Sequence, residues 1–82
     1  MNQNKINYIV GKNIKKYRLL YNINNDCNIT QEKLAELINV SVSTIGSLES
    51  PKINRGISIN NLYKISMVLD TPINKFFEDT FK

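Results

Sequence analysis

The chain has 82 residues and a mass of 9.5 kDa, the size of one small domain, which excludes a multidomain enzyme. Apolar residues make up 41% and charged residues 22% of the chain, close to the values of globular domains, so we expect a folded core rather than disorder. Eleven Lys and Arg against seven Asp and Glu give a net charge of +4 and a pI near 9.3, a balance that suits a polyanionic partner.

The first predicted helix spans residues 8–21, and the segment after it is predicted to be a loop. Apolar side chains recur at the i, i+4, i+7, i+11 spacing of one helical face. They are Val10, Ile14, Tyr17 and Tyr21. Residues 22–28 (NINNDCN) are polar and rich in Asn without any period, a composition typical of loops.

The second predicted helix begins after Thr30, whose hydroxyl is placed to accept a hydrogen bond from an early free amide of the helix. It is expected to end at about Leu37 or Ile38. Asn39 follows, a residue that tolerates the left-handed conformation of a tight turn better than most. The sequence therefore predicts a sharp turn directly after this helix.

The third predicted helix begins after Ser41 as N-cap and runs through Glu49. Pro51 disfavours helical geometry at the residue before it, so the helix must end there. Residues 52–57 are expected to form a loop that contains Gly56.

Two more helices are predicted in the C-terminal third. Ser58 is the expected N-cap of the fourth, whose apolar residues recur every three or four positions; they are Ile59, Leu62, Ile65, and Val68 or Leu69. Thr71 is the expected N-cap of a short fifth helix with Pro72 at its first position. Its apolar residues are Ile73, Phe76 and Phe77. No segment shows sustained strand alternation, so the predicted fold is all-α with five short helices.

Residues 30–49 (TQEKLAELINVSVSTIGSLE) thus form two short helices joined by a tight turn in a small basic domain, the geometry of a DNA-binding helix-turn-helix. The motif positions are Thr30, Gln31, Leu34, Ala35, Asn39, Val40, Ser41, Ser43, Thr44, Ile45 and Glu49. Flanking positions that match are Val10, Gly11, Ile14, Tyr17 and Arg18 before the motif, and Ser58, Leu62, Ile65 and Leu69 after it. With these residues the chain resembles the XRE family, the helix-turn-helix domains of phage Cro and repressor proteins, over about residues 9–78.

The resemblance implies a five-helix, lambda-repressor-like DNA-binding domain over residues 1–82, with helices 2 and 3 as the helix-turn-helix. Helices 4 and 5, at about 58–80, are then expected to serve packing and dimerisation. Small Ala35 would let the two motif helices approach closely, and apolar residues would lock their angle. These are Leu34, Ile38, Val40, Ile45 and Leu48.

The expected DNA-binding residues lie on the third helix and in the loop after it. In the family, the Gln that opens the second helix binds backbone phosphate or braces the recognition helix, and Gln31 inherits that expectation. The third helix would present Ser41, Val42, Ser43, Thr44, Gly46 and Ser47 to the major groove. Lys52 and Arg55, with Asn54, lie where family members commonly touch the backbone.

The third helix contains no Lys, Arg, Asn or Gln, so the bidentate contacts that read guanine or adenine most strongly are missing from it. Val42 can pack on a thymine methyl group, while Ser and Thr bond base edges with little selectivity. We therefore infer an A/T-leaning operator read in part through DNA shape. Residues 30–49 carry three carboxylates and one Lys, whereas residues 1–29 carry five basic side chains and one acidic, so attraction to phosphate must come from the flanks.

Self-association is expected through the C-terminal helix. Phe76, Phe77 and Phe81 cannot all be buried easily in a monomer of this size, and a small core gains stability from oligomerisation. Ile73, Phe77 and Phe81 are the predicted dimer surface. The sequence thus predicts a homodimeric transcriptional regulator, a repressor in the simplest case, on an inverted repeat of double-stranded DNA.

The sequence also fits other functions. A third helix without Lys, Arg, Asn or Gln also suits a protein-interaction module of the same fold, such as an antitoxin. In such a module Ser43, Thr44 and Ser47 are ordinary solvent-facing residues. Small single-domain members of the family also include restriction-modification controller proteins. Lys12, Lys15 and Lys16 form either a solvated helix face or a surface near DNA.

An enzyme is the least favoured function. The chain has no His, so the commonest general base and metal ligand are missing, and we expect no catalytic residues, no metal site and no cofactor. No paired carboxylates, phosphate-binding Gly loop or small-molecule substrate site is indicated. A lone cysteine, Cys27, and the lack of a signal peptide or long apolar run lead us to expect a cytoplasmic protein without a membrane partner.

Overall fold

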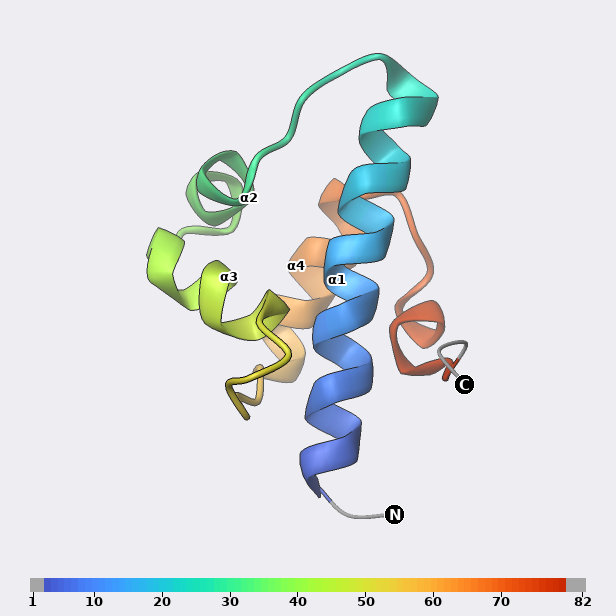
Figure 1. Ribbon diagram of the computed structural model, residues 1–82. Coiled ribbons are helices and arrows are strands. Elements are labelled where there is room, and N and C mark those ends of the chain that lie inside the picture. Colours follow the sequence, from blue (N-terminus) through green and yellow to red (C-terminus); the bar gives the residue numbers. More distant parts are fainter. Residues whose placement is uncertain (1–2, 80–82) are drawn as a thin grey trace.

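The computed structural model of the chain describes residues 3–79 and is built from helices (Figure 1). In chain order they are α1 (Gln3–Asn25), α2 (Gln31–Ile38), α3 (Val42–Glu49), α4 (Ile59–Val68) and a 3-10 helix, η1 (Ile73–Phe77). No strand occurs within the described residues. The all-α prediction and the order of its five elements are therefore confirmed.

The long helix α1 is the central support of the molecule. It packs against α3 on one side and against η1 on the other, while α2 contacts α3 and α4 (Figure 1). One apolar core fills the space between the helices. Its buried members are Val10, Ile14, Leu34, Ala35, Ile38, Ile45, Leu48, Leu62, Ile65, Leu69 and Phe76. The helix-turn-helix is thus held by contacts on both α1 and α4.

Gly11 sits where α1 crosses α3. A Cβ atom built on Gly11 would overlap the backbone carbonyl oxygen of Leu48, in the last turn of α3. Any side chain at this position would push the two helices apart, because backbone at a packed contact has little room to move. The absence of a side chain at Gly11 therefore sets how closely α3 lies against α1.

Helix α1 is longer than predicted: it extends to Asn25, so the prediction of a loop from residue 22 is wrong. The side chain of Asn22 accepts from the backbone N–H of Ile29 (2.7 Å) and donates to the Ile29 carbonyl (3.0 Å). Asp26, at φ 50°, then turns the chain, and the Cys27 N–H bonds back to the Asn22 carbonyl. Side-chain hydrogen bonds to Ile29, seven residues on, thus hold in a helix the Asn-rich residues whose composition suggests a loop.

The helix boundaries at α2, α3 and α4 are confirmed. The side chains of Thr30, Ser41 and Ser58 each accept a hydrogen bond from the backbone N–H three residues later. Asn39 adopts the predicted left-handed conformation, at φ 61°. These ends depend on bonds within a few residues, which is why local sequence predicts them.

The start of the fifth element differs from the prediction. Thr71 does not cap it, because its hydroxyl donates instead to the Leu69 carbonyl (2.9 Å). Pro72 has ψ 139° and precedes η1 rather than forming its first residue, and η1 is a 3-10 helix of five residues. The buried Asn13 of α1 holds this segment, since its amide donates to the carbonyls of Phe76 (2.8 Å) and Glu78 (2.9 Å). A contact 63 residues away in sequence therefore shapes η1.

Candidate nucleic-acid interface

Helices α2 and α3 form a rigid pair joined by a three-residue turn. The N–H groups of Asn39 and Val40 bond back to the carbonyls of Glu36 (3.2 Å) and Ala35 (2.9 Å), which closes the end of α2. Ala35 is buried at the crossing of the helices, as predicted. The direction of α3 relative to α2 is therefore fixed by backbone hydrogen bonds and by the core.

The N-terminal turn of α3 faces solvent. Val42 is 48% exposed, and Ser41 and Ser43 are also exposed. The Ser41 hydroxyl caps the Thr44 N–H and lies 3.0 Å from the Ser43 hydroxyl and 2.8 Å from the Thr44 hydroxyl. This turn thus presents one apolar side chain beside a cluster of three hydroxyl groups.

Farther along α3 the predicted contact residues are less exposed to solvent than expected. Thr44, Gly46 and Ser47 are half-buried. Gly46 lies under the side chain of Gln31, because a Cβ there would be 3.6 Å from the Gln31 Oε1 atom. The surface of α3 that a groove could contact is therefore concentrated at its first turn.

Three polar side chains join α1, α2 and α3 behind this surface. The guanidinium group of Arg18 makes a bidentate pair with the buried Glu49 carboxylate, both bonds 2.9 Å long. Arg18 also donates to the Ile29 carbonyl (3.1 Å). Gln31 Nε2 donates to Glu49 Oε1 (2.9 Å), so in this structure Gln31 braces the recognition helix.

Reasoning from the sequence did not find this network. Arg18 and Glu49 are 31 residues apart, and each appears in the sequence only as a position that matches the family. The available signal was the placement of three polar residues, 18, 31 and 49, on the inner faces of three helices. Glu49 is the only carboxylate of α3 and is buried in this network, so α3 presents no exposed negative charge.

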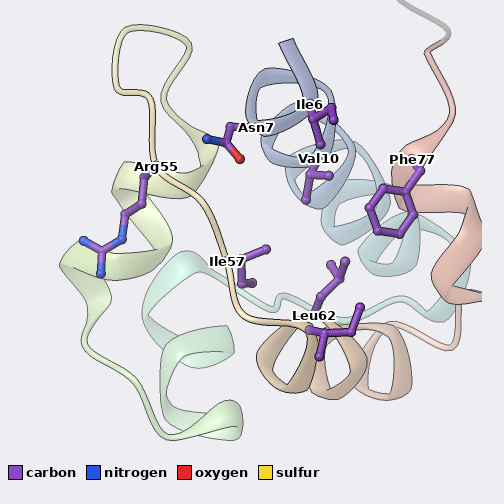
Figure 2. A pocket seen from close by; sticks show the side chains of 8 residues that line it. Ile6, Asn7, Val10, Arg55, Ile57, Leu62 and Phe77 are labelled. Atoms are coloured by element: carbon purple, nitrogen blue, oxygen red, sulfur yellow. The ribbon is translucent and has the colours of Figure 1, made fainter. Parts of the chain in front are cut away.

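The loop after α3 carries the predicted phosphate contacts. Lys52, Asn54 and Arg55 are all exposed, and Asn54 Oδ1 accepts from the amide of Asn7 on α1 (2.8 Å). In Figure 2 the Arg55 guanidinium points away from an apolar cavity of about 170 Å³, whereas Ile57 points towards it. The loop is therefore anchored on one side and leaves the Arg55 charge on its outer side.

The charges of the chain are unevenly distributed. Helix α1 contains no acidic residue along its 23 residues, and none occurs from Ser50 to Leu69. The first acidic residue of the chain is Asp26. The side of the molecule formed by α1 and the loop after α3 is thus mainly basic, which favours contact with an anionic partner on that side. The exception on this side is Asp79, which pairs with Lys5 of α1 (3.7 Å).

The predicted dimer residues have different environments. Ile73 packs partly against the core, Phe77 is 48% exposed, and Phe81 lies outside the described residues. The sequence did not single out the outer face of α4. Ile59, Tyr63 and Met67 recur there at i, i+4 and i+8 and are 70%, 55% and 64% exposed. That spacing was the signal for a second apolar face.

Comparison with known proteins agrees with this geometry. Residues 14–76 match a helix-turn-helix family model. No curated protein matches the chain. Among residues 3–79, no helix has the combined length and hydropathy needed to span a bilayer. Since the family match covers more than half of the chain and includes the whole α2–α3 pair, the chain belongs to this helix-turn-helix family, the XRE family of DNA-binding transcriptional regulators, which are not enzymes.

Proposed function

We propose that the chain is a small repressor that binds an inverted repeat of double-stranded DNA as a homodimer. The observation that carries the proposal is the exposed first turn of α3 on a helix pair that is rigidly supported from behind. A locked pair of this kind lets the N-terminal half of the second helix enter a major groove about 12 Å wide.

Base recognition would depend on few contacts. Val42, which is exposed, would pack on a thymine methyl group, and the hydroxyl groups of Ser41, Ser43 and Thr44 would bond base edges or phosphate. Ser47, one turn on, is the next contact of this kind. Gln31 would act by bracing α3, and Lys52, Asn54 and Arg55 would bind the backbone. Such a surface favours A/T-rich sites and leaves part of the specificity to DNA shape.

A second copy would cover the apolar surface where α1, α4 and η1 meet. Phe77, Ile59 and Ile6 line the cavity of about 170 Å³ and are all exposed in the single chain. Exposed apolar residues that gather on one face mark an interface in a soluble domain. The molecule measures 35 × 25 × 21 Å, so two copies side by side can place their α3 helices about 34 Å apart, one turn of DNA.

The recognition surface is tested by Val42→Asp. Val42 is the first residue of α3, where an acidic side chain suits the helix dipole, so the melting temperature should stay within about 3 °C of the parent. Binding to a duplex from upstream of the chain's own coding sequence, measured by fluorescence anisotropy beside a shuffled duplex, should weaken at least about a hundredfold, because the carboxylate meets the bases and phosphates of the groove.

The matched control is Ile23→Asp, which adds the same charge at a 75% exposed position at the far end of α1 and should leave binding nearly unchanged. If both variants lose the same affinity for the duplex, the effect comes from the change in net charge and not from contact with the groove. If the parent chain binds neither duplex but captures a protein in place of DNA, the competing function is favoured, a protein-interaction module such as an antitoxin. The observation that supports this second candidate is that α3 contains no Lys, Arg, Asn or Gln.

The dimer surface is tested by Phe77→Asp. A half-exposed ring contributes little to the core of one chain, while a charge at the centre of an apolar interface is costly to bury. We expect the dimer dissociation constant from sedimentation equilibrium to rise at least about thirtyfold, with helicity unchanged. Ile23→Asp again serves as the control. A parent chain that is monomeric at all concentrations, free and on DNA, contradicts the homodimer.

A further inference from the structure

A small pocket lies between the N-terminal part of α1 and the loop after α3. It has a volume of about 230 Å³ and is lined by Tyr8, Pro51, Lys52, Ile53 and Asn54. Tyr8 comes from α1 and is 44% exposed, so its side chain is accessible at the edge of the pocket. The pocket is thus lined by a tyrosine from α1 and a lysine from the loop, and both side chains end in a hydrogen-bond donor.

A second ammonium group stands beside this pocket. The Nζ atom of Lys12 lies 5.7 Å from the centroid of the Tyr8 ring, one helical turn along α1, in a cation–π contact. Neither α1 nor the loop contributes a carboxylate; Glu49, just before the loop, is buried and paired with Arg18, and Asp79 pairs with Lys5 of α1 (3.7 Å). The local charge around the pocket is therefore positive.

We propose that Tyr8, Lys12 and Lys52 form a binding site for one phosphate of the DNA backbone, on the assumption that the chain binds DNA as proposed above. A phosphodiester carries one negative charge and accepts several hydrogen bonds, which matches two ammonium groups and one hydroxyl. From the sequence, backbone contacts are expected from the loop and from Gln31, while Lys12 fits either a solvated helix face or a surface near DNA. The site adds α1 to the DNA-binding surface.

The position of the pocket gives this site a specific role. Pro51 and Lys52 follow the last turn of α3 within three residues, and Gly11 lies against Leu48 of that turn. Tyr8 and Lys12 flank Gly11 on α1. A phosphate held between α1 and the loop would therefore stand at a fixed distance from the first turn of α3. It would set how deeply that turn enters the groove, since phosphate contacts fix the register of a protein on the duplex.

The test compares Lys12→Gln with a matched control on the same helix. Lys16 also lies over a tyrosine ring, 5.2 Å from the centroid of Tyr17, but Tyr17 packs on Phe76 of η1, away from α3. Lys12→Gln should weaken binding to the upstream duplex and to the shuffled duplex alike, by about tenfold, and lower the salt slope by about one unit for each bound protomer. Lys16→Gln should change neither, and Lys52→Gln should behave like Lys12→Gln.

Tyr8→Phe tests the contribution of the hydroxyl group apart from that of the ring. It keeps the cation–π partner of Lys12 and removes one neutral hydrogen-bond donor, so affinity should fall about fivefold with an unchanged salt slope. Duplexes in which single phosphates are replaced by neutral methylphosphonates locate the contact. One replacement should weaken the parent and Tyr8→Phe strongly, because both keep the two ammonium groups, and should weaken Lys12→Gln less, because one of these groups is already gone.

The outcomes separate this site from the proposed function. If the parent binds no duplex, DNA binding itself fails. If the parent binds with a steep salt dependence while Lys12→Gln and Lys16→Gln are indistinguishable, the repressor function stands and the α1 site is wrong. A sequence-selective loss in Lys12→Gln also contradicts the site, because a phosphate contact carries no base information.

Discussion

Replacing Gly11 with Ala should destabilise the domain by about 3 kcal/mol and lower its melting temperature by more than about 12 °C. Helix propensity alone predicts the opposite sign, because Ala is favoured over Gly inside a helix by about 1 kcal/mol. The clash with the Leu48 carbonyl decides the outcome, since the obstacle is backbone and not the end of a flexible side chain. Thermal unfolding followed by circular dichroism measures the change.

Gly46→Ala is the matched control for this prediction. Gly46 also lies inside a helix, but a Cβ there meets only the Gln31 side chain, at an ordinary 3.6 Å. We expect this variant to be more stable than the parent by up to about 1 kcal/mol. If both variants are stabilised alike, the close approach of α1 and α3 is not limiting. DNA binding by Gly11→Ala, measured below its melting temperature, reports in addition whether displacing α3 weakens recognition.

Arg18→Met should cost about 3–5 kcal/mol, because it leaves the Glu49 carboxylate buried without its charged partner. The side chains of Arg18 and Glu49 are only 9% and 1% exposed, so solvent cannot replace the lost bonds. Gln31 would remain as a single neutral donor to the carboxylate. Denaturant unfolding of the variant, with helicity checked by circular dichroism, measures the loss.

The double variant Arg18→Met with Glu49→Met separates the charge effect from general packing. Without either charge the site is apolar, and we expect most of the lost stability to return, as happens when buried ion pairs are replaced whole. The coupling free energy from the double-mutant cycle should be at least about 2 kcal/mol. Additive losses in the cycle would show that the two side chains act independently, against the bidentate geometry.

Those parts of the structure that depend on near neighbours in the chain were predicted from the sequence. Thr30, Ser41 and Ser58 cap helices within one turn, and Asn39 closes a turn with bonds to the helix it follows. Ala35 at the crossing follows from the motif. These features are encoded by residue type and spacing alone, so the helix-turn-helix and its boundaries emerge without the rest of the fold.

The errors arise from bonds that reach beyond one helical turn, over seven residues at Asn22 and over 31 or 63 residues elsewhere. Asn22 is helical because its side chain bonds Ile29, and η1 takes its shape because Asn13 bonds the carbonyls that end it. Arg18 and Glu49 meet only when α1 and α3 pack together. Composition reports average preferences of Asn and Arg, and it carries no information about which distant group satisfies them. Of the candidate site, the exposed turn of α3 was predicted, while the network behind it was not.

The division between the exposed turn of α3 and its buried inner face has an evolutionary consequence. Val42 and Ser43 project from the helix, while Ile45 and Leu48 belong to the core. Substitutions at the outward positions cost little in folding, because they leave the packing of the helix pair untouched. Under the proposed function, a lineage carrying this domain can therefore change its DNA specificity through a series of stable intermediates, one codon at a time.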